Sequence, residues 1–201
     1  MNSAVLVLLL INFGLIGLLP VLFFRRDGTF NLRWCLTALP FCAAVAIVIS
    51  GWLGVLSPLF AGGSPLLAAL QVLAVPLSAA SIGLMCMTIA VHRVPLALWH
   101  QDNDDPSEIV TWGPYARVRH PFYSSFLLAF GAVMLLFPHY LTALLLGVAF
   151  VSLNTTALRE EHRLEASQFG STYAQYMAQT GRFVPRARSL FSTSGWQDDT
   201  R

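Results

Sequence analysis

Two polar clusters at the ends of one apolar stretch carry the residues that could do chemistry in this sequence. The first is GPYARVRHPFY, residues 113–123, where arginine, histidine and tyrosine stand directly before an apolar run. The second, residues 159–185, begins REEHRLEASQFG and contains adjacent acids, Glu160 and Glu161. Carboxylates bind ammonium groups and hydroxyls, whereas arginine, histidine and backbone N–H groups bind carboxylates. Together, the clusters could hold a ligand that carries both kinds of group.

The apolar run between the clusters predicts a helical hairpin. Residues 121–158 contain no Asp, Glu, Lys or Arg. They can form two helices that turn at FPHY, residues 137–140, because proline ends the helix before it. A hairpin places the start of its first helix beside the end of its second. We therefore expect His120 and Tyr123 to lie close to the two adjacent glutamates.

The composition predicts an integral membrane protein. Of the 201 residues, 56% are hydrophobic and 11% are charged, against roughly 25% charged in a soluble domain. A spanning helix needs about 20 apolar residues, a length that residues 3–24, 34–56 and 66–91 supply. We expect a single all-α domain, residues 1–201: five transmembrane helices, the last two a tight hairpin, and a cytoplasmic C-terminal helix. Its parts are three spans within 1–93, the motif region 113–185 and a flexible tail at 190–201.

The arginines predict the orientation of these spans. All twelve basic residues are arginine, and five spans place all of them on one side of the membrane. Cytoplasmic loops carry the excess of arginine in membrane proteins. We therefore expect the N-terminus outside and both polar clusters in the cytoplasm, in the inner membrane of a bacterium.

The cysteines and histidines predict no metal site. Cys35, Cys42 and Cys86 lie in apolar stretches, with spacing that suits neither zinc nor a disulfide framework. We expect all three to be buried as small apolar residues. The histidines give no ligand pattern, and nothing in the sequence indicates a nucleic-acid partner.

The ordered motifs resemble the isoprenylcysteine carboxyl methyltransferase family and, more widely, the membrane phospholipid methyltransferases. From Gly113 to Pro185 they read G-P-Y-x-x-V-R-H-P-x-Y, a hydrophobic hairpin, then R-E-E-x-x-L, F-G, Y-x-x-Y and R-x-x-P. That family binds S-adenosylmethionine in a cytoplasm-facing pocket built from both clusters. The resemblance implies an S-adenosylmethionine-dependent methyltransferase with a lipophilic acceptor that arrives through the bilayer, an isoprenylcysteine carboxylate-like acid being favoured.

The resemblance also assigns roles to residues. Arg119 and Glu160 are the expected catalytic residues, and Arg159, Trp99 and Trp112 are expected to bind the substrate. The expected cofactor-binding residues are Gly113, Tyr115, Arg119, His120, Pro121, Tyr123, Glu160 and Glu161.

Neighbouring charged residues should have different roles. Arg117 and Arg119 are two residues apart, a spacing that places them on different faces of a helix. We expect Arg119 to hold a pocket residue or the cofactor's carboxylate, and Arg117 to meet lipid phosphates or water. Adjacent helical residues point about 100° apart. One of Glu160 and Glu161 should therefore face the cofactor and the other a neighbouring arginine.

Several alternatives stay open at this point. Ser125 stands where family members often have glycine, and its side chain could narrow the pocket. The acceptor could be a phospholipid or a small amine or thiol, and the oligomeric state is not determined. A membrane reductase with a nicotinamide cofactor, or a non-catalytic transporter or structural subunit, is a further possibility. Taken singly, arginine and tyrosine at a membrane surface also fit simple interfacial anchors.

Overall fold

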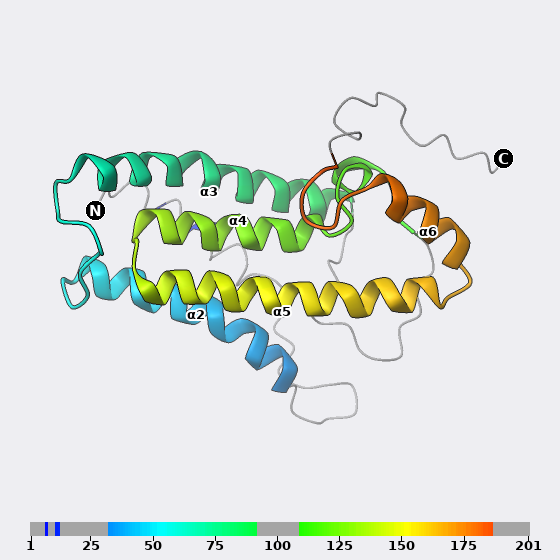
Figure 1. Ribbon diagram of the computed structural model, residues 1–201, viewed down its shortest axis with the longest axis horizontal. Coiled ribbons are helices and arrows are strands. Elements are labelled where there is room, and N and C mark those ends of the chain that lie inside the picture. Colours follow the sequence, from blue (N-terminus) through cyan, green and yellow to red (C-terminus); the bar gives the residue numbers. More distant parts are fainter. Residues whose placement is uncertain (1–6, 8–10, 13–31, 92–108, 187–201) are drawn as a thin grey trace. The chain divides into compact units, whose positions relative to one another are not determined.

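The structure is a computed structural model that describes residues 7, 11–12, 32–91 and 109–186. These ranges contain five α-helices, one short 3-10 helix and no β-strand (Figure 1). The expected first span, Trp99 and the expected tail lie outside the described residues or largely so. The helices are α2 (Leu32–Trp52), α3 (Pro65–Val91), α4 (Pro121–Leu136), α5 (Tyr140–Glu165) and α6 (Gly170–Gln179), and the 3-10 helix is η1 (Gly113–Ala116).

Two of these helices are long and apolar enough to cross a membrane. They are α3, with 27 residues, and α5, with 26. The apolar part of α2 and the whole of α4 are shorter. At 1.5 Å per residue, the 16 residues of α4 cover about 24 Å, less than the roughly 30 Å of a bilayer's hydrocarbon core. The all-helical class is confirmed, and the five-span arrangement stays a proposal.

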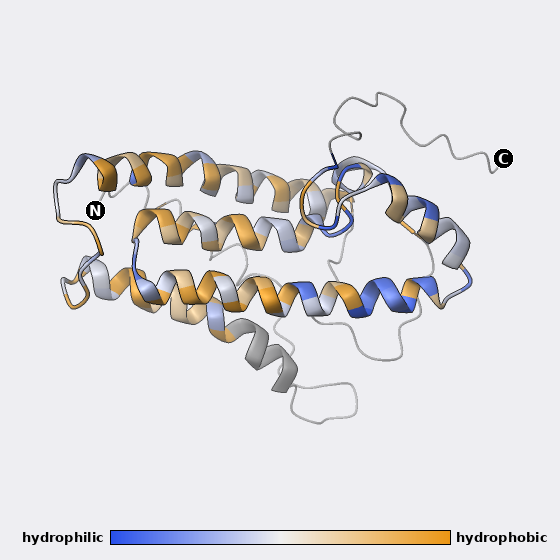
Figure 2. Cartoon of the chain, in the orientation of Figure 1, coloured by the Kyte–Doolittle hydropathy of each residue, from blue (hydrophilic) through white to orange (hydrophobic). Residues whose placement is uncertain are grey.

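The hairpin of α4 and α5 forms at the predicted turn, but α5 is longer than the apolar run. It continues through the charged segment that follows residue 158 and ends at Glu165. Figure 2 shows this helix changing from hydrophobic to hydrophilic toward its C-terminal end. Arg, Glu and Leu are good helix formers, so the start of the charged segment ends the apolar stretch and not the helix. The second polar cluster thus begins on a rigid element.

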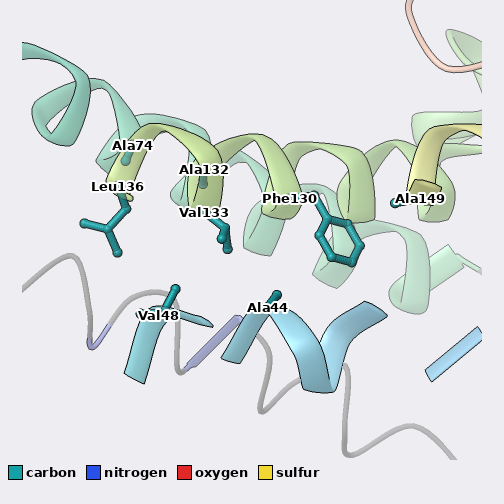
Figure 3. Close-up of a cluster of buried hydrophobic side chains, with 8 residues drawn as sticks. All are labelled: Ala44, Val48, Ala74, Phe130, Ala132, Val133, Leu136 and Ala149. Atoms are coloured by element: carbon teal, nitrogen blue, oxygen red, sulfur yellow. The ribbon is translucent and has the colours of Figure 1, made fainter. Parts of the chain in front are cut away.

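The described chain divides into two compact units, and the first holds an apolar core. This unit takes residues up to Gly83 and Ser125–Ser152. Its core is rich in alanine, which lets helices approach closely. Gly51 also requires close packing, because a Cβ there would lie 2.5 Å from the Phe137 ring. The core residues, drawn in Figure 3, are Ala44, Val48, Ala74, Phe130, Ala132, Val133, Leu136 and Ala149.

The prediction that the cysteines are buried is wrong for two of them. Cys42 and Cys86 are exposed on the surface of their helices, and the side chain of Cys35 is not among those described. Val72 and Met87 on α3 are likewise 66% and 54% exposed. An apolar helix of this kind need not bury every apolar side chain in protein, since lipid is equally apolar. Hydrophobicity therefore did not indicate which face packs.

Ser125, the residue at the family's glycine position, is fully buried in the first unit. Its backbone carbonyl accepts a hydrogen bond of 2.7 Å from the hydroxyl of Ser81 on α3. This bond joins α4 to α3, and the same hydroxyl also contacts Oδ1 of Asn12 at 3.2 Å. The effect of the serine on a bound cofactor stays a prediction.

Candidate functional site

The second unit, Leu84–Ser124 together with the chain from Leu153 onward, contains the candidate site. Its first polar cluster begins with a turn that requires glycine. Gly113 has φ +63°, and a Cβ on it would lie 2.8 Å from Cγ2 of Val91. Pro114 then starts η1, and Pro121 starts α4, since proline suits the first turn of a helix. The backbone at Gly113 therefore lies close to the side chain of Val91.

A short segment after α6, residues 180–183, pairs with the first cluster, and we call it the strap. It forms a parallel bridge between Val118 and Gly181. The N–H of Arg119 donates to the carbonyl of Gly181 at 2.8 Å, and the N–H of His120 donates to the carbonyl of Arg182 at 3.1 Å. Segments 60 residues apart in sequence therefore lie side by side, and the strap fixes the backbone of Arg119 and His120.

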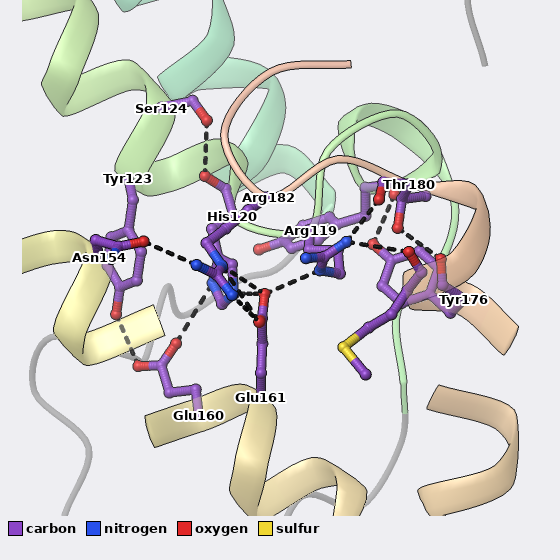
Figure 4. A network of polar contacts seen from close by, with 12 residues as sticks. Arg119, His120, Tyr123, Ser124, Asn154, Glu160, Glu161, Tyr176, Thr180 and Arg182 are labelled. Atoms are coloured by element: carbon purple, nitrogen blue, oxygen red, sulfur yellow. Dashed lines mark hydrogen bonds and ion pairs between the residues drawn. The ribbon is translucent and has the colours of Figure 1, made fainter. Parts of the chain in front are cut away.

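Glu161 lies at the centre of a buried polar network (Figure 4). Its Oε1 accepts from Nε of Arg119 at 2.9 Å. Nε of Arg182 donates to Oε1 at 3.1 Å and to Oε2 at 3.2 Å, and Nη2 of Arg182 donates to Oε2 at 2.7 Å. His120 Nε2 lies 3.3 Å from the same Oε1. Glu161 is only 4% exposed, so two guanidinium groups compensate the cost of burying its charge.

The neighbouring Glu160 has different partners. The hydroxyl of Tyr123 donates to its Oε1 at 2.7 Å, and its Oε2 lies 3.5 Å from Nδ1 of His120. Its side chain is 23% exposed, against 6% for Glu161. The expected division between the two acids is confirmed in one respect, because one of them faces the arginines. The predicted proximity of His120 and Tyr123 to the glutamates is also confirmed.

Arg119 donates hydrogen bonds to three groups of the protein. Besides Glu161, its Nη1 donates to the carbonyl of Thr180 at 2.5 Å and to that of Met177 at 3.3 Å. These carbonyls end α6, where a cation satisfies otherwise unpaired acceptors. Arg119 thus contacts Glu161, another predicted site residue, and Arg117 is exposed. The role of Arg119 in a ligand pocket stays a prediction.

His120 presents its two ring nitrogens to the two acids. The ring stacks on Tyr123 with 5.3 Å between centroids. Burial lowers the pKa of His120, opposed by the hydrogen bond and charge of Glu161, while the charges of Arg119 and Arg182 lower it further. A neutral imidazole has one donor and one acceptor. We assign the proton to Nε2, which makes the shorter contact, so Nδ1 faces Glu160 as an acceptor.

Tyrosines line the second unit beside this network. Burial, followed by the charge of Glu160, raises the pKa of Tyr115 to about 12. Burial likewise raises the pKa of Tyr176, whose hydroxyl donates to the carbonyl of Tyr115 at 2.6 Å. Both phenols therefore stay protonated at neutral pH, and that of Tyr176 acts as a neutral donor.

The structure brings together five of the predicted site residues, Arg119, His120, Tyr123, Glu160 and Glu161. The charge of Glu160 contributes to the raised pKa of Tyr115. Pro121 is buried at the start of α4. The predicted substrate-binding residues are not part of this network. Trp112 is 61% exposed, Arg159 is exposed, and Trp99 is not described.

Sequence reasoning did not select two residues that complete the network. Arg182 was visible only as the arginine of R-x-x-P, and its Nη1 donates to Oδ1 of Asn154 at 2.8 Å. Asn154 is an amide within an otherwise apolar run, and that contrast was the available signal. In the described part of the chain, no group of three or more His, Cys, Asp or Glu residues could hold a metal ion.

The described part of the chain thus combines apolar helices long enough to cross a membrane with a buried network of charged side chains. Residues 72–166 match the model of the isoprenylcysteine carboxyl methyltransferase (ICMT) family. This match confirms the resemblance read from the motifs. It includes the first cluster, α4 and α5, and it ends before the strap.

One similar protein is named for metal resistance and not for methyl transfer. The chain is 31% identical over 117 residues to the cobalt-zinc-cadmium resistance protein CzcN of Cupriavidus metallidurans. The aligned part is 58% of this chain and 53% of the relative. This chain thus spans about half the length of that protein.

Proposed function

We propose that this protein is an integral membrane methyltransferase that uses S-adenosylmethionine and acts on a lipophilic acceptor. The observation that carries the proposal is the 3.5 Å distance between Nδ1 of His120 and Oε2 of Glu160. With the proton assigned to Nε2, both of these atoms are acceptors. Two acceptors at this distance favour a ligand N–H or O–H that both can bind. The match to a methyltransferase family supports the same reading.

The donor and acceptor set fits this cofactor. Its ammonium and ribose hydroxyls need acceptors, which Glu160 and His120 supply. Tyr115, which is half-buried, offers aromatic surface for the adenine of the cofactor, whereas the ring of Tyr123 is already stacked on His120. When bound, the cofactor supplies a methyl group on a sulfonium, whose leaving group is a neutral thioether. The protein therefore needs no general acid, and its own residues orient the ligands and exclude water.

Within this proposal Glu160 contacts the cofactor, and Arg119 has a positioning role. Arg119 already bonds Glu161 and two carbonyls at the end of α6. Moving it onto a ligand would leave Glu161 buried with less compensation. The geometry thus favours an indirect role for Arg119, through Glu161.

The proposed acceptor is a lipophilic acid such as an isoprenylcysteine carboxylate. An ionised carboxylate needs no base, only positive charge beside it. Arg182 and Arg119 are committed to Glu161, whereas Arg159 is exposed next to Glu160. Arg159 is therefore the residue we propose for the acceptor. Lipid headgroups, amines and thiols are tested in the same assay.

The proposed membrane arrangement has five spans, the N-terminus outside and the site in the cytoplasm of a bacterial cell. Labelling of single cysteines introduced at residues 60 and 175, with the three native cysteines removed, tests it. We expect labelling from the outside at 60 and from the inside at 175. Labelling of both from one side contradicts the arrangement.

Calorimetry on the purified protein in detergent tests the proposed activity. We expect S-adenosylhomocysteine to bind and a nicotinamide dinucleotide not to bind. Glu160→Gln should weaken binding about 10- to 150-fold, the effect of losing one charge-assisted hydrogen bond. Glu165→Gln is the matched control, because Glu165 is exposed on the same helix.

Methyl transfer from radiolabelled cofactor to a prenylcysteine analogue, to extracted lipids and to small amines and thiols then identifies the acceptor. Binding of the nicotinamide dinucleotide alone favours the reductase alternative. Folded protein that binds neither ligand rejects both enzyme readings.

A further inference from the structure

Arg182 joins three parts of the site through one side chain and one carbonyl. Its Nε and Nη2 bond Glu161, its Nη1 donates to Asn154 at 2.8 Å, and its carbonyl accepts the N–H of His120 at 3.1 Å. Asn154 and Glu161 lie seven residues apart on α5. Arg182 therefore fastens the strap to two turns of α5 and to the residue before α4.

These contacts use the planar shape of the guanidinium group. One edge, Nε with Nη2, forms a forked contact with the carboxylate of Glu161, while Nη1 is directed to the amide oxygen of Asn154. Lysine carries the same charge but cannot make both contacts in this geometry. The site thus depends on arginine at this position for shape as well as for charge.

The backbone of the strap is fixed on both sides of Arg182. A Cβ on Gly181 would collide with the carbonyl oxygen of Val184, so glycine is needed where the strap turns. The hydroxyl of Ser124 also donates to the carbonyl of Phe183 at 2.8 Å. The backbone is therefore fixed at Gly181 and at Phe183, the two residues that flank Arg182.

We propose that Arg182 is a positioning residue for His120: by fixing Glu161 and the strap, it keeps Nε2 of the imidazole on Glu161 and Nδ1 beside Glu160. The inference rests on the proposed function, since Nδ1 and Glu160 are the proposed ligand acceptors. Arg182 need not touch the ligand to affect its binding.

In the described part of the chain, the charged or titratable groups around His120 are Arg119, Tyr123, Glu160, Glu161 and Arg182, and all of them bear on this role. Arg119 is its chain neighbour, Tyr123 stacks on it from α4, Glu160 and Glu161 face it from α5, and Arg182 reaches Glu161 from the strap. Removing Arg182 takes away a positive charge and leaves Glu161 with one guanidinium. Both changes favour the imidazolium form of His120. An imidazolium donates from both nitrogens, so Nδ1 would then bind Glu160 in place of a ligand.

The test measures S-adenosylhomocysteine binding by calorimetry from about pH 5.5 to 8.5, a range that includes the ordinary histidine titration. For Arg182→Gln we expect affinity at least about tenfold weaker near pH 6, with the acid limb of the profile moved to higher pH. Asn154→Ala and Arg182→Lys keep the charge, so they should weaken binding and leave the acid limb in place. Arg186→Lys is the matched control and should bind as the wild type does.

A second measurement does not depend on ligand. Nitrogen NMR shifts of labelled histidine report which ring nitrogen carries the proton, and His120→Asn identifies the signal. We expect the wild-type spectrum to show the proton of His120 on Nε2. In the Arg182→Lys spectrum we expect a mixture of the Nε2–H and Nδ1–H tautomers. This measurement also decides the question if Arg182→Gln does not fold.

The outcomes separate this inference from the function on which it rests. Wild-type protein that does not bind S-adenosylhomocysteine rejects the proposed function. Wild-type binding with an unchanged pH profile in Arg182→Gln, or unchanged histidine spectra in Arg182→Lys, rejects the positioning role alone. An Arg186→Lys effect as large as that of Arg182→Lys also rejects it.

Discussion

Replacing Glu161 by glutamine should lower the stability of the protein, whereas replacing Glu160 by glutamine should lower its affinity for the ligand. Glu161→Gln removes the charge that compensates Arg119 and Arg182, and it places an amide NH2 group against guanidinium donors. Breaking a buried ion pair costs about 3–5 kcal/mol. We take about 3 kcal/mol, because the side chain of Arg182 is 29% exposed and exposed charge pairs contribute less.

That loss should be visible as a lower melting temperature. For a chain of this size, each kcal/mol shifts the midpoint by roughly 2–4 °C, so Glu161→Gln should melt about 6–12 °C below the wild type. Glu160→Gln keeps the acceptor for the hydroxyl of Tyr123 and should cost only about 1 kcal/mol. Glu160→Gln should instead lose ligand affinity.

The assay measures melting by intrinsic fluorescence in detergent and S-adenosylhomocysteine binding on the same preparations. Glu165→Gln serves as the control for a lost charge on α5. The reasoning fails if Glu160→Gln is the less stable variant, or if Glu161→Gln melts as the wild type does. Equal loss of affinity with equal stability in both variants would also refute the division between the acids.

Further variants test the strap and the arginines. Gly181→Ala should destabilise the protein and abolish ligand binding, because its Cβ meets the carbonyl of Val184; melting and calorimetry check this, and wild-type behaviour would contradict it. Arg119→Lys should lose most methyl transfer while Arg117→Lys retains most of it, since only the first makes a directed network; equal losses at matched expression would make Arg119 a simple anchor. The pKa of His120 is lowered from 6.5 in the folded protein. Its contribution to stability is therefore complete above pH 6.5 and declines as the pH falls, so His120→Gln should reduce the acid dependence of melting, and an unchanged dependence would contradict this.

The sequence was sufficient to predict the meeting of the two polar clusters. The turn at residues 137–140 and the uncharged run around it allowed one connection, and that connection places Tyr123 beside Glu160. The observed 2.7 Å hydrogen bond between them needed no long-range information. Local rules succeed here because the two segments belong to consecutive helices with a short link.

The strap could not be predicted in the same way. The strap pairs with a segment about 60 residues earlier in the sequence. The pairing uses backbone N–H and carbonyl groups, which every residue type except proline has, so the sequence does not indicate it. Gly181 and Arg182 gave only weak signals, a glycine and an arginine after a polar helix. The outward orientation of Cys42 and Cys86 failed for a related reason, because helices that are apolar on every side show no period that identifies the packed face.

The two arginines also explain why a charged cluster stands at the start of an apolar helix. Arg119 and Arg182 together match the charges of Glu161 and Glu160, and a neutral His120 leaves the network close to electrically neutral. A neutral site binds a ligand head that carries one ammonium and one carboxylate with less electrostatic cost than it binds an isolated charge. Glu161 binds both guanidinium groups, whereas Glu160 contacts the hydroxyl of Tyr123 and lies beside Nδ1 of His120. The cluster is thus built to orient one carboxylate and one imidazole, and the arginines act by fixing the acid next to them.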